Sequence, residues 1–202
     1  LSDDALNGAA WCEYRSGALK PALASFNMLI AKYPDSGLIP AAIFRTGNIN
    51  LKLSRNLDAQ KAFKKLVESY PKERIAVDAH LELGKLYIQK KEYSKASPHF
   101  EKAQESEIME MRTEASYWLG ESEAAREKYN AAIAAYERII SYGISDMSWI
   151  SLAYVKIGVN KERLKLWDEA QAAYQKALEI LEDKDLKTFA EERLKIIKAK
   201  PR

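Results

Sequence analysis

The sequence contains a single cysteine, Cys12, among its 202 residues, so no disulfide can form within the chain. Long hydrophobic runs are also absent: one of the longest, residues 38–44, contains a proline, and we expect no membrane span. No motif surrounds Cys12, and we expect its side chain to fill a small apolar space. The fold must therefore be held together by packing alone.

An excess of charge of one sign is missing from most of the chain. The 32 Lys and Arg residues nearly balance the 29 Asp and Glu residues, which leaves a net charge of +3. Only residues 186–202 are locally basic, and a solvated final helix with Lys near its C-terminus accounts for them. Nucleic-acid binding usually needs a denser basic surface, so we expect no nucleic-acid partner.

Residue types that carry catalysis or bind metals are few and scattered. His80 and His99 are the only histidines, and they do not cluster with Cys12 as zinc ligands would. No glycine-rich phosphate loop occurs, and carboxylates such as Glu121 and Glu123 stand two residues apart, on different faces of a helix. We therefore expect no enzyme, no metal and no other cofactor, and structural or surface roles for both histidines.

What the sequence does have is an internal repeat. The segment ASFNMLIAKYP at residues 24–34 returns as KAFKKLVESYP at residues 61–71. Phe, Leu and Pro stand at the same steps in both segments, and steps of three and four residues place side chains on one helix face. The proline follows the helix, because it cannot continue the hydrogen-bond ladder. Each Tyr-Pro therefore predicts the end of a helix.

The same spacing continues along the chain without the proline. One alanine per unit recurs, namely Ala22, Ala59, Ala96, Ala132 and Ala170. Twelve residues before each alanine stands a small residue, namely Ala10, Gly47, Gly84, Gly120 and Gly158. Four residues after each alanine stands an aromatic residue, namely Phe26, Phe63, Phe100, Tyr136 and Tyr174. A mid-helix glycine costs about 1 kcal/mol relative to alanine, so its recurrence predicts two helices in close approach, with the rings filling the gap toward the next unit.

The third unit resembles the tetratricopeptide repeat, a helix-turn-helix unit, through Leu83-Gly84, Tyr87, Tyr93, Ala96, Phe100 and Ala103. The first unit departs most from the pattern, with Ala10 for the glycine and Glu13 for an aromatic residue, and the second has Asn50 at that aromatic position. The resemblance covers five units over roughly residues 3–182. It implies an all-α, right-handed solenoid of helix-turn-helix hairpins.

We expect one domain over residues 1–202, since no stretch has the composition of a linker. The repeats are expected at approximately residues 3–36, 40–73, 77–110, 113–146 and 151–182. Residues 183–200 carry apolar side chains at helical spacing. They are expected to form a C-terminal helix that covers the last repeat, or the first helix of a further repeat.

The resemblance implies a non-catalytic scaffold that binds a peptide or partner protein in a concave groove lined by the first helices. The family's inward positions give the predicted partner-binding residues Trp11, Tyr14, Phe44, Asn48, Leu51, Lys85, Tyr117 and Glu121. They also place Leu81, Ala124, Val155, Val159, Glu162 and Arg163 on this face. Such a groove would bind through apolar anchors with scattered charges. The alternative for the rings is packing within or between hairpins.

One known type of groove is not expected. Repeats that grip chaperone C-terminal carboxylates use a Lys/Asn/Arg arrangement, and here Asn7 and Trp11 stand where its first Lys and Asn would be.

The alternative functions are a structural spacer or a self-associating subunit within a larger complex. The F-x-x-L-x-x-x-Y-P ending of the first two repeats is similar to repeats of bacterial cell-envelope proteins. It favours a periplasmic or envelope location in a Gram-negative bacterium, with the cytoplasm as the alternative.

Overall fold

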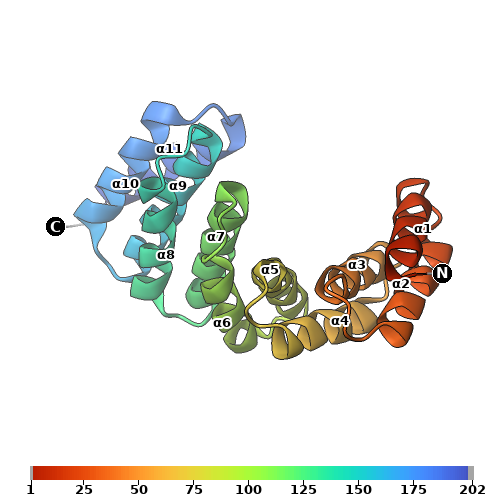
Figure 1. Ribbon diagram of the computed structural model, residues 1–202. Coiled ribbons are helices and arrows are strands. Elements are labelled where there is room, and N and C mark those ends of the chain that lie inside the picture. The colour runs from red at the N-terminus through yellow and green to blue at the C-terminus, as the bar shows by residue number, and fades with distance from the viewer. Residues whose placement is uncertain (1, 200–202) are drawn as a thin grey trace. The chain divides into compact units, whose positions relative to one another are not determined.

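The computed structural model describes residues 2–199, which form eleven helices and no strand (Figure 1). The helices are α1 (Asp3–Arg15), α2 (Leu19–Lys32), α3 (Ile39–Lys52), α4 (Asn56–Ser69), α5 (Arg74–Gln89), α6 (Tyr93–Ala103), α7 (Met109–Ala125), α8 (Tyr129–Ser141), α9 (Met147–Arg163), α10 (Trp167–Ile180) and α11 (Lys184–Lys198). The predicted all-α fold is confirmed. The last residue of the predicted helix at 183–200 lies outside the described residues.

The chain divides into two compact units, residues 1–90 and residues 91–202. The first unit holds α1 to α5, and the second holds α6 to α11. The boundary falls inside the predicted third repeat, between its first and second helices. The single domain expected over residues 1–202 stays a prediction, and its ends at residues 1 and 200–202 lie outside the described residues.

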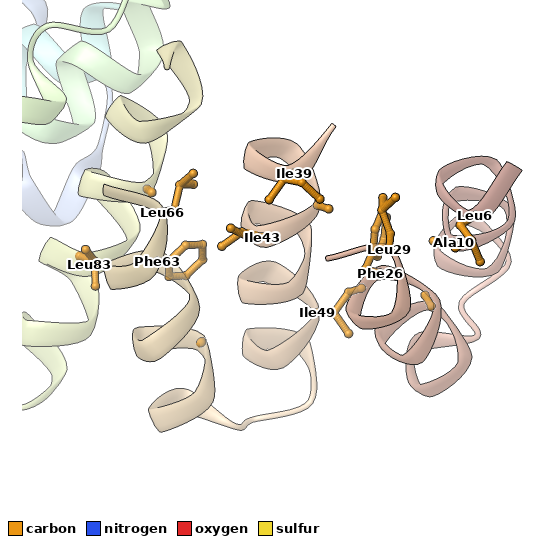
Figure 2. Close-up of a cluster of buried hydrophobic side chains, with 14 of the residues drawn as sticks. Leu6, Ala10, Phe26, Leu29, Ile39, Ile43, Ile49, Phe63, Leu66 and Leu83 are labelled. Carbon is orange, nitrogen blue, oxygen red and sulfur yellow. The ribbon is translucent and has the colours of Figure 1, made fainter. Parts of the chain in front are cut away.

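In the first unit, each helix packs against the next along the chain, and α3 also lies beside α5. Buried apolar side chains from all five helices form one core cluster (Figure 2). Its members include Leu6, Ala10, Phe26, Leu29, Ile39, Ile43, Ile49, Phe63, Leu66 and Leu83. In the second unit, consecutive helices again pack together, and the first helices α7, α9 and α11 also meet in sequence. First helices therefore adjoin first helices in both units, which is the arrangement that a binding face needs.

The turn inside each hairpin has one shared backbone feature. Gly17, Ser54, Lys91, Glu127 and Lys165 all have φ values between 58° and 81°, and each stands five residues before a repeat alanine. At Ser54, Glu127 and Lys165, the residue that follows donates its N–H to a carbonyl five residues back, as in a Schellman motif. Only the first turn uses glycine for this left-handed conformation, so the sequence gives little sign of the other four.

Three of the mid-helix glycines lie directly against the aromatic rings of their own hairpins. A Cβ atom added at Gly47 would lie 2.4 Å from Phe63, and one added at Gly120 would lie 2.5 Å from Tyr136. At Gly158, the corresponding distance to Tyr174 is 2.8 Å. The predicted close approach is present, and all five repeat alanines are fully buried. The predicted place of the rings is corrected, since these three fill the space over the glycine and not only a gap toward the next unit.

Side-chain placement corrects a second prediction. Cys12 is exposed on α1 and fills no apolar space, because it stands two residues after the buried Ala10 and so on another face of the helix. His80 and His99 are half-buried. Residues 2–199 contain no group of three or more His, Cys, Asp or Glu side chains placed to hold a metal ion. Over the same range, every helix is too short or too polar to cross a bilayer.

Candidate partner-binding site

The predicted binding residues of the first unit lie on the first helices of its repeats. Trp11 and Tyr14 lie on α1, while Phe44 and Leu51 lie on α3, and all four are half-buried and pack against the core cluster. The half-buried side chains of Asn48 on α3 and Lys85 on α5 complete the set in this unit. The aromatic residues are therefore partly core and partly surface, so each ring both supports the fold and presents an edge to solvent.

Two cations of α3 lie over the rings of α1. The Arg45 guanidinium carbon lies 4.4 Å from the centroid of the Trp11 ring, and Lys52 Nζ lies 4.7 Å from the centroid of the Tyr14 ring. Trp11 and Tyr14 meet edge to face, with their centroids 5.8 Å apart. Cation–π contacts of this kind stabilise each partner in place. The result is a surface of two rings and two positive charges that spans two repeats.

A second helix pair shows that Arg45 occupies a recurring position. Arg45 stands two residues before Gly47 and contacts Trp11, which stands one residue after Ala10 in the preceding repeat. Lys156 likewise stands two residues before Gly158, and its Nζ lies 2.9 Å from Oε1 of Glu121, one residue after Gly120. The sequence prediction omitted Arg45 and Lys156. This offset between neighbouring repeats is the signal that could have found them.

On α5, the charges are partly matched by neighbours. Lys85, a predicted binding residue, forms an ion pair with Glu82 at 3.1 Å. Burial raises the pKa of Asp78 above its usual value, while the charges of Arg74 and Arg45 oppose that rise. Arg45 therefore lies within the electrostatic reach of an acid on α5 as well as over the Trp11 ring.

In the second unit, Glu121 is held by protein groups. It accepts a 2.5 Å hydrogen bond from the Tyr136 hydroxyl and pairs with Lys156, whose Nζ lies 5.7 Å from the Tyr117 ring. Burial raises the pKa of Tyr136, and the charge and hydrogen bond of Glu121 raise it further. Burial would lower the pKa of Lys156, but the hydrogen bond and charge of Glu121 outweigh it and raise that pKa. Glu121 therefore has a structural role beside any role in binding.

The same hydroxyl–carboxylate pairing occurs in the fifth repeat. The Tyr174 hydroxyl donates a 2.7 Å hydrogen bond to Glu162, which also accepts from Arg193 Nε at 2.9 Å. Glu162 is buried, as are Leu81 and Val155, so the placement of these three on an open binding face is wrong. Val155 packs in a core cluster with residues of α10 and α11, and Glu162 faces Tyr174 and Arg193 of the same two helices. The sequence carried a signal for both pairs, because a tyrosine that replaces a buried phenylalanine needs a partner for its hydroxyl.

Predicted inward residues of α7 and α9 do line a hollow. Its volume is about 430 Å³, and its lining includes Glu121, Ala124, Lys156, Val159, Asn160 and Arg163. Tyr117 lies near this region, half-buried and in contact with the Lys156 side chain. The hollow joins apolar side chains and charged groups of both signs.

Repeated helical hairpins, three of them with an aromatic ring seated over a mid-helix glycine, define a helical-repeat protein. A family profile described as Tetratricopeptide repeat matches residues 44–108 and 81–146, and a second profile of the same description matches residues 4–36 and 152–180. The chain belongs to the tetratricopeptide repeat family. Members of this family typically serve as non-catalytic protein-interaction modules, which supports an interaction scaffold.

Solved structures share this fold at low sequence identity. The chain is similar to YrrB, described as a TPR protein with an unusual peptide-binding site, at a TM-score of 0.74 and 18% identity, covering 93% of this chain and 90% of YrrB. It is also similar to a MamA protein at a TM-score of 0.70 and 22% identity, and the match covers 88% of this chain and 90% of the MamA chain. MamA from Desulfovibrio magneticus RS-1 is similar at a TM-score of 0.67 and 17% identity, and the match covers 88% of this chain and 94% of that protein. A search of curated protein sequences finds no match.

Proposed function

We propose that the chain is a non-catalytic scaffold that binds a peptide or an extended segment of a partner protein on the first helices of residues 2–90. The observation that carries the proposal is the pair of half-buried rings, Trp11 and Tyr14, each with a cation of α3 placed over it. Trp, Tyr and Arg are the residues most enriched at binding hot spots. The peptide-binding site named for YrrB supports a peptide as the ligand.

The proposed contacts are of two kinds: apolar side chains that anchor the peptide, and polar or charged side chains that orient it. Trp11, Tyr14 and Phe44 supply apolar contact area, with Leu51 beside them on the same face of α3. The amide of Asn48 can donate to or accept from the main chain of an extended peptide. Arg45 and Lys52 favour acidic or carbonyl-rich segments at the same surface. In residues 91–199, the hollow of α7 and α9 offers Lys156 and Arg163 in a similar role.

Site-specific photo-crosslinking tests the proposal in source cells. A photo-reactive amino acid in place of Asn48 should give covalent adducts with a partner, because this position lies among the proposed contacts. The matched control is the same amino acid in place of Lys61, whose side chain is 80% exposed on the second helix α4. Adducts at position 48 that disappear when Trp11→Ala is added would support binding at this surface. Adducts only at position 61 would contradict it.

Self-association is the second candidate function, and an observation on α11 favours it. This helix exposes Phe189 and Ile196 at 39% and 46%, seven residues apart and so on one face. Light scattering at high protein concentration should then detect a dimer or larger assembly that Ile196→Lys dissolves. If position 48 gives no adducts and the protein is monomeric, the structural spacer becomes the better hypothesis.

The envelope location that the Tyr-Pro repeats favour stays a prediction. Fractionation of source cells into periplasm, membranes and cytoplasm, followed by detection of the chain with an antibody, tests it directly. Recovery in the cytoplasmic fraction alone would select the alternative.

A further inference from the structure

Two hollows adjoin each other at the N-terminal ends of first helices in the second unit. One has a volume of about 330 Å³ and is lined by α7 and by the loop before α9. The other has a volume of about 640 Å³ and extends to the start of α11. Both are lined by Ser145, Asp146 and Trp149. We call the two together the acidic groove, and the residues of the proposed binding face are not part of it.

The charge of this groove has one sign. Its lining includes Glu110, Asp146, Glu182 and Asp183, all exposed, and none of the lining residues within the described range 2–199 is basic. Hydrogen bonds from the Ser148 side chain and backbone lower the pKa of Asp146, which keeps that carboxylate charged. Such a site, in a chain whose net charge is +3, attracts cations and repels acidic segments.

The floor and edges of the groove are apolar. Trp149 is half-buried in both hollows, with its ring centroid 5.5 Å from that of Tyr117. Met109 and Met147 are 36% and 51% exposed at the rims. Methionine side chains adapt to differently shaped apolar partners, and tryptophan is a common anchor residue at interfaces. The groove therefore offers apolar contacts between its negative charges.

One buried polar group in the groove lacks a partner in the protein. Thr113 is 1% exposed and lines the smaller hollow, and its hydroxyl has no hydrogen-bond partner within residues 2–199. Leaving a buried hydroxyl unpaired costs free energy, and nearly all such groups in proteins are paired. A carbonyl or amide of a bound chain that entered this hollow would remove that cost.

We infer that the acidic groove is a second docking site, which takes a cationic peptide segment of a partner protein with apolar side chains between its lysines or arginines. The carboxylates hold the positive charges, Trp149 and the two methionines contact the apolar side chains, and Thr113 pairs with a polar group of the peptide. The charge, the apolar floor and the unpaired hydroxyl all select this one chemistry. The inference stands independently of binding at Trp11 and Tyr14.

Fluorescence anisotropy with the full chain and short labelled peptides tests the inference. A peptide of alternating leucine and lysine should bind, whereas the leucine–glutamate and serine–lysine peptides should bind about tenfold more weakly or not at all, since one lacks the charge and the other the apolar contacts. The variant Glu110→Gln with Glu182→Gln should weaken binding of the leucine–lysine peptide about tenfold and reduce its salt dependence. Asn48→Ala, on the proposed binding face, should leave this binding unchanged.

Thr113→Val separates binding from stability. Valine has nearly the same shape without the hydroxyl, so the melting temperature of the free protein should stay the same or rise, while binding of the leucine–lysine peptide weakens. Equal binding of the serine–lysine peptide, or binding unaffected by both the Glu110/Glu182 and the Thr113 variants, would overturn the inference. A dimer of the free chain that Glu110→Gln with Glu182→Gln dissolves would also overturn it, because a second copy would then occupy the groove.

Discussion

Gly120 lies under the ring of Tyr136, and the fit leaves no room for a methyl group. A Cβ atom at position 120 would approach a ring carbon to 2.5 Å. The ring is fully buried, and its hydroxyl is hydrogen-bonded to Glu121, so it cannot move aside without losing that bond. We predict that Gly120→Ala lowers the free energy of unfolding by about 1–3 kcal/mol, measured by urea denaturation.

Gly8 provides the matched control for that substitution. It lies within α1, is exposed, and has no atom within 4 Å of an added Cβ. The same exchange to alanine should therefore stabilise the protein by up to about 1 kcal/mol, because alanine favours the helix. Equal effects of the two substitutions would show that helix propensity, and not the space beneath the ring, decides the residue at position 120.

Tyrosine replaces phenylalanine at this ring position in the fourth and fifth repeats, and each hydroxyl donates to a carboxylate. Burial and the adjacent glutamates raise the pKa of Tyr136 and of Tyr174 above the value of about 10 for an exposed tyrosine. Below pH ~10 both states keep the proton, so the contribution to stability is complete there. As pH rises above ~10, the unfolded chain releases the proton while the folded chain keeps it, and stability falls.

We predict that this alkaline loss of stability depends on the two hydroxyls. The variant Tyr136→Phe with Tyr174→Phe should show a smaller decline in the urea midpoint between about pH 9 and pH 11 than the unchanged chain. At about pH 9, it should be the less stable of the two, because two hydrogen bonds to carboxylates are gone. Parallel declines in both proteins would show that other groups dominate the alkaline range.

Helix α11 is held on the last hairpin by one strong polar contact beside its apolar face. Arg193 of α11 donates from two guanidinium nitrogens to Glu162 of α9, whose side chain is only 7% exposed. Ala190, Leu194 and Ile197 supply the buried face. The Asp183 side chain caps the helix by accepting from the N–H of Leu186.

We predict that Arg193→Met loosens α11 more than the rest of the second unit. It removes the cation from a buried carboxylate, and since the Arg193 side chain is 34% exposed, we expect a cost of about 1–3 kcal/mol and no more. Amide hydrogen exchange should become faster along α11, with smaller changes in α7 and α8. Lys195→Met, at an exposed position of the same helix, is the control and should leave exchange rates unchanged.

The parts of the fold that could be predicted from sequence are those that depend on the volumes of recurring side chains. Alanine, small residue and ring recur at set distances along the chain, so the register of the hairpins could be predicted. The exposure of Cys12 could not be predicted from its residue type, because its place on α1, two residues after the buried Ala10, decides it. The hairpin turns could be predicted, but the left-handed backbone at Ser54, Lys91, Glu127 and Lys165 could not, because none of these residues is glycine.

The candidate site could be predicted less fully than the fold. Positions on the first helices placed Trp11 and Tyr14 correctly on α1, but the cations over their rings come from the next repeat, at an offset that only the packing reveals. The acidic groove could not be predicted from the sequence. Its residues come from α7, the loop before α9, α9 itself, the end of α10, the segment before α11 and the start of α11, and no local pattern joins Glu110 to Glu182.

Across the whole molecule, the question is whether the two compact units unfold together. Each unit has its own tightly seated ring, Phe63 over Gly47 in the first and Tyr136 over Gly120 in the second. Trp11 reports on the first unit, and the three other tryptophans, Trp118, Trp149 and Trp167, report on the second. The chain therefore contains a matched perturbation and a separate probe for each unit.

We predict a single cooperative transition, because the boundary at residues 90 and 91 divides the predicted third repeat, and helical repeats derive much of their stability from neighbouring elements. In a variant that keeps Trp11 and replaces the other tryptophans with phenylalanine, fluorescence and far-ultraviolet circular dichroism should then give the same urea midpoint. Gly47→Ala and Gly120→Ala should each lower that common midpoint. If Gly47→Ala instead moves only the Trp11 signal and Gly120→Ala leaves that signal in place, residues 1–90 and 91–202 are two domains, and the prediction of one domain is wrong.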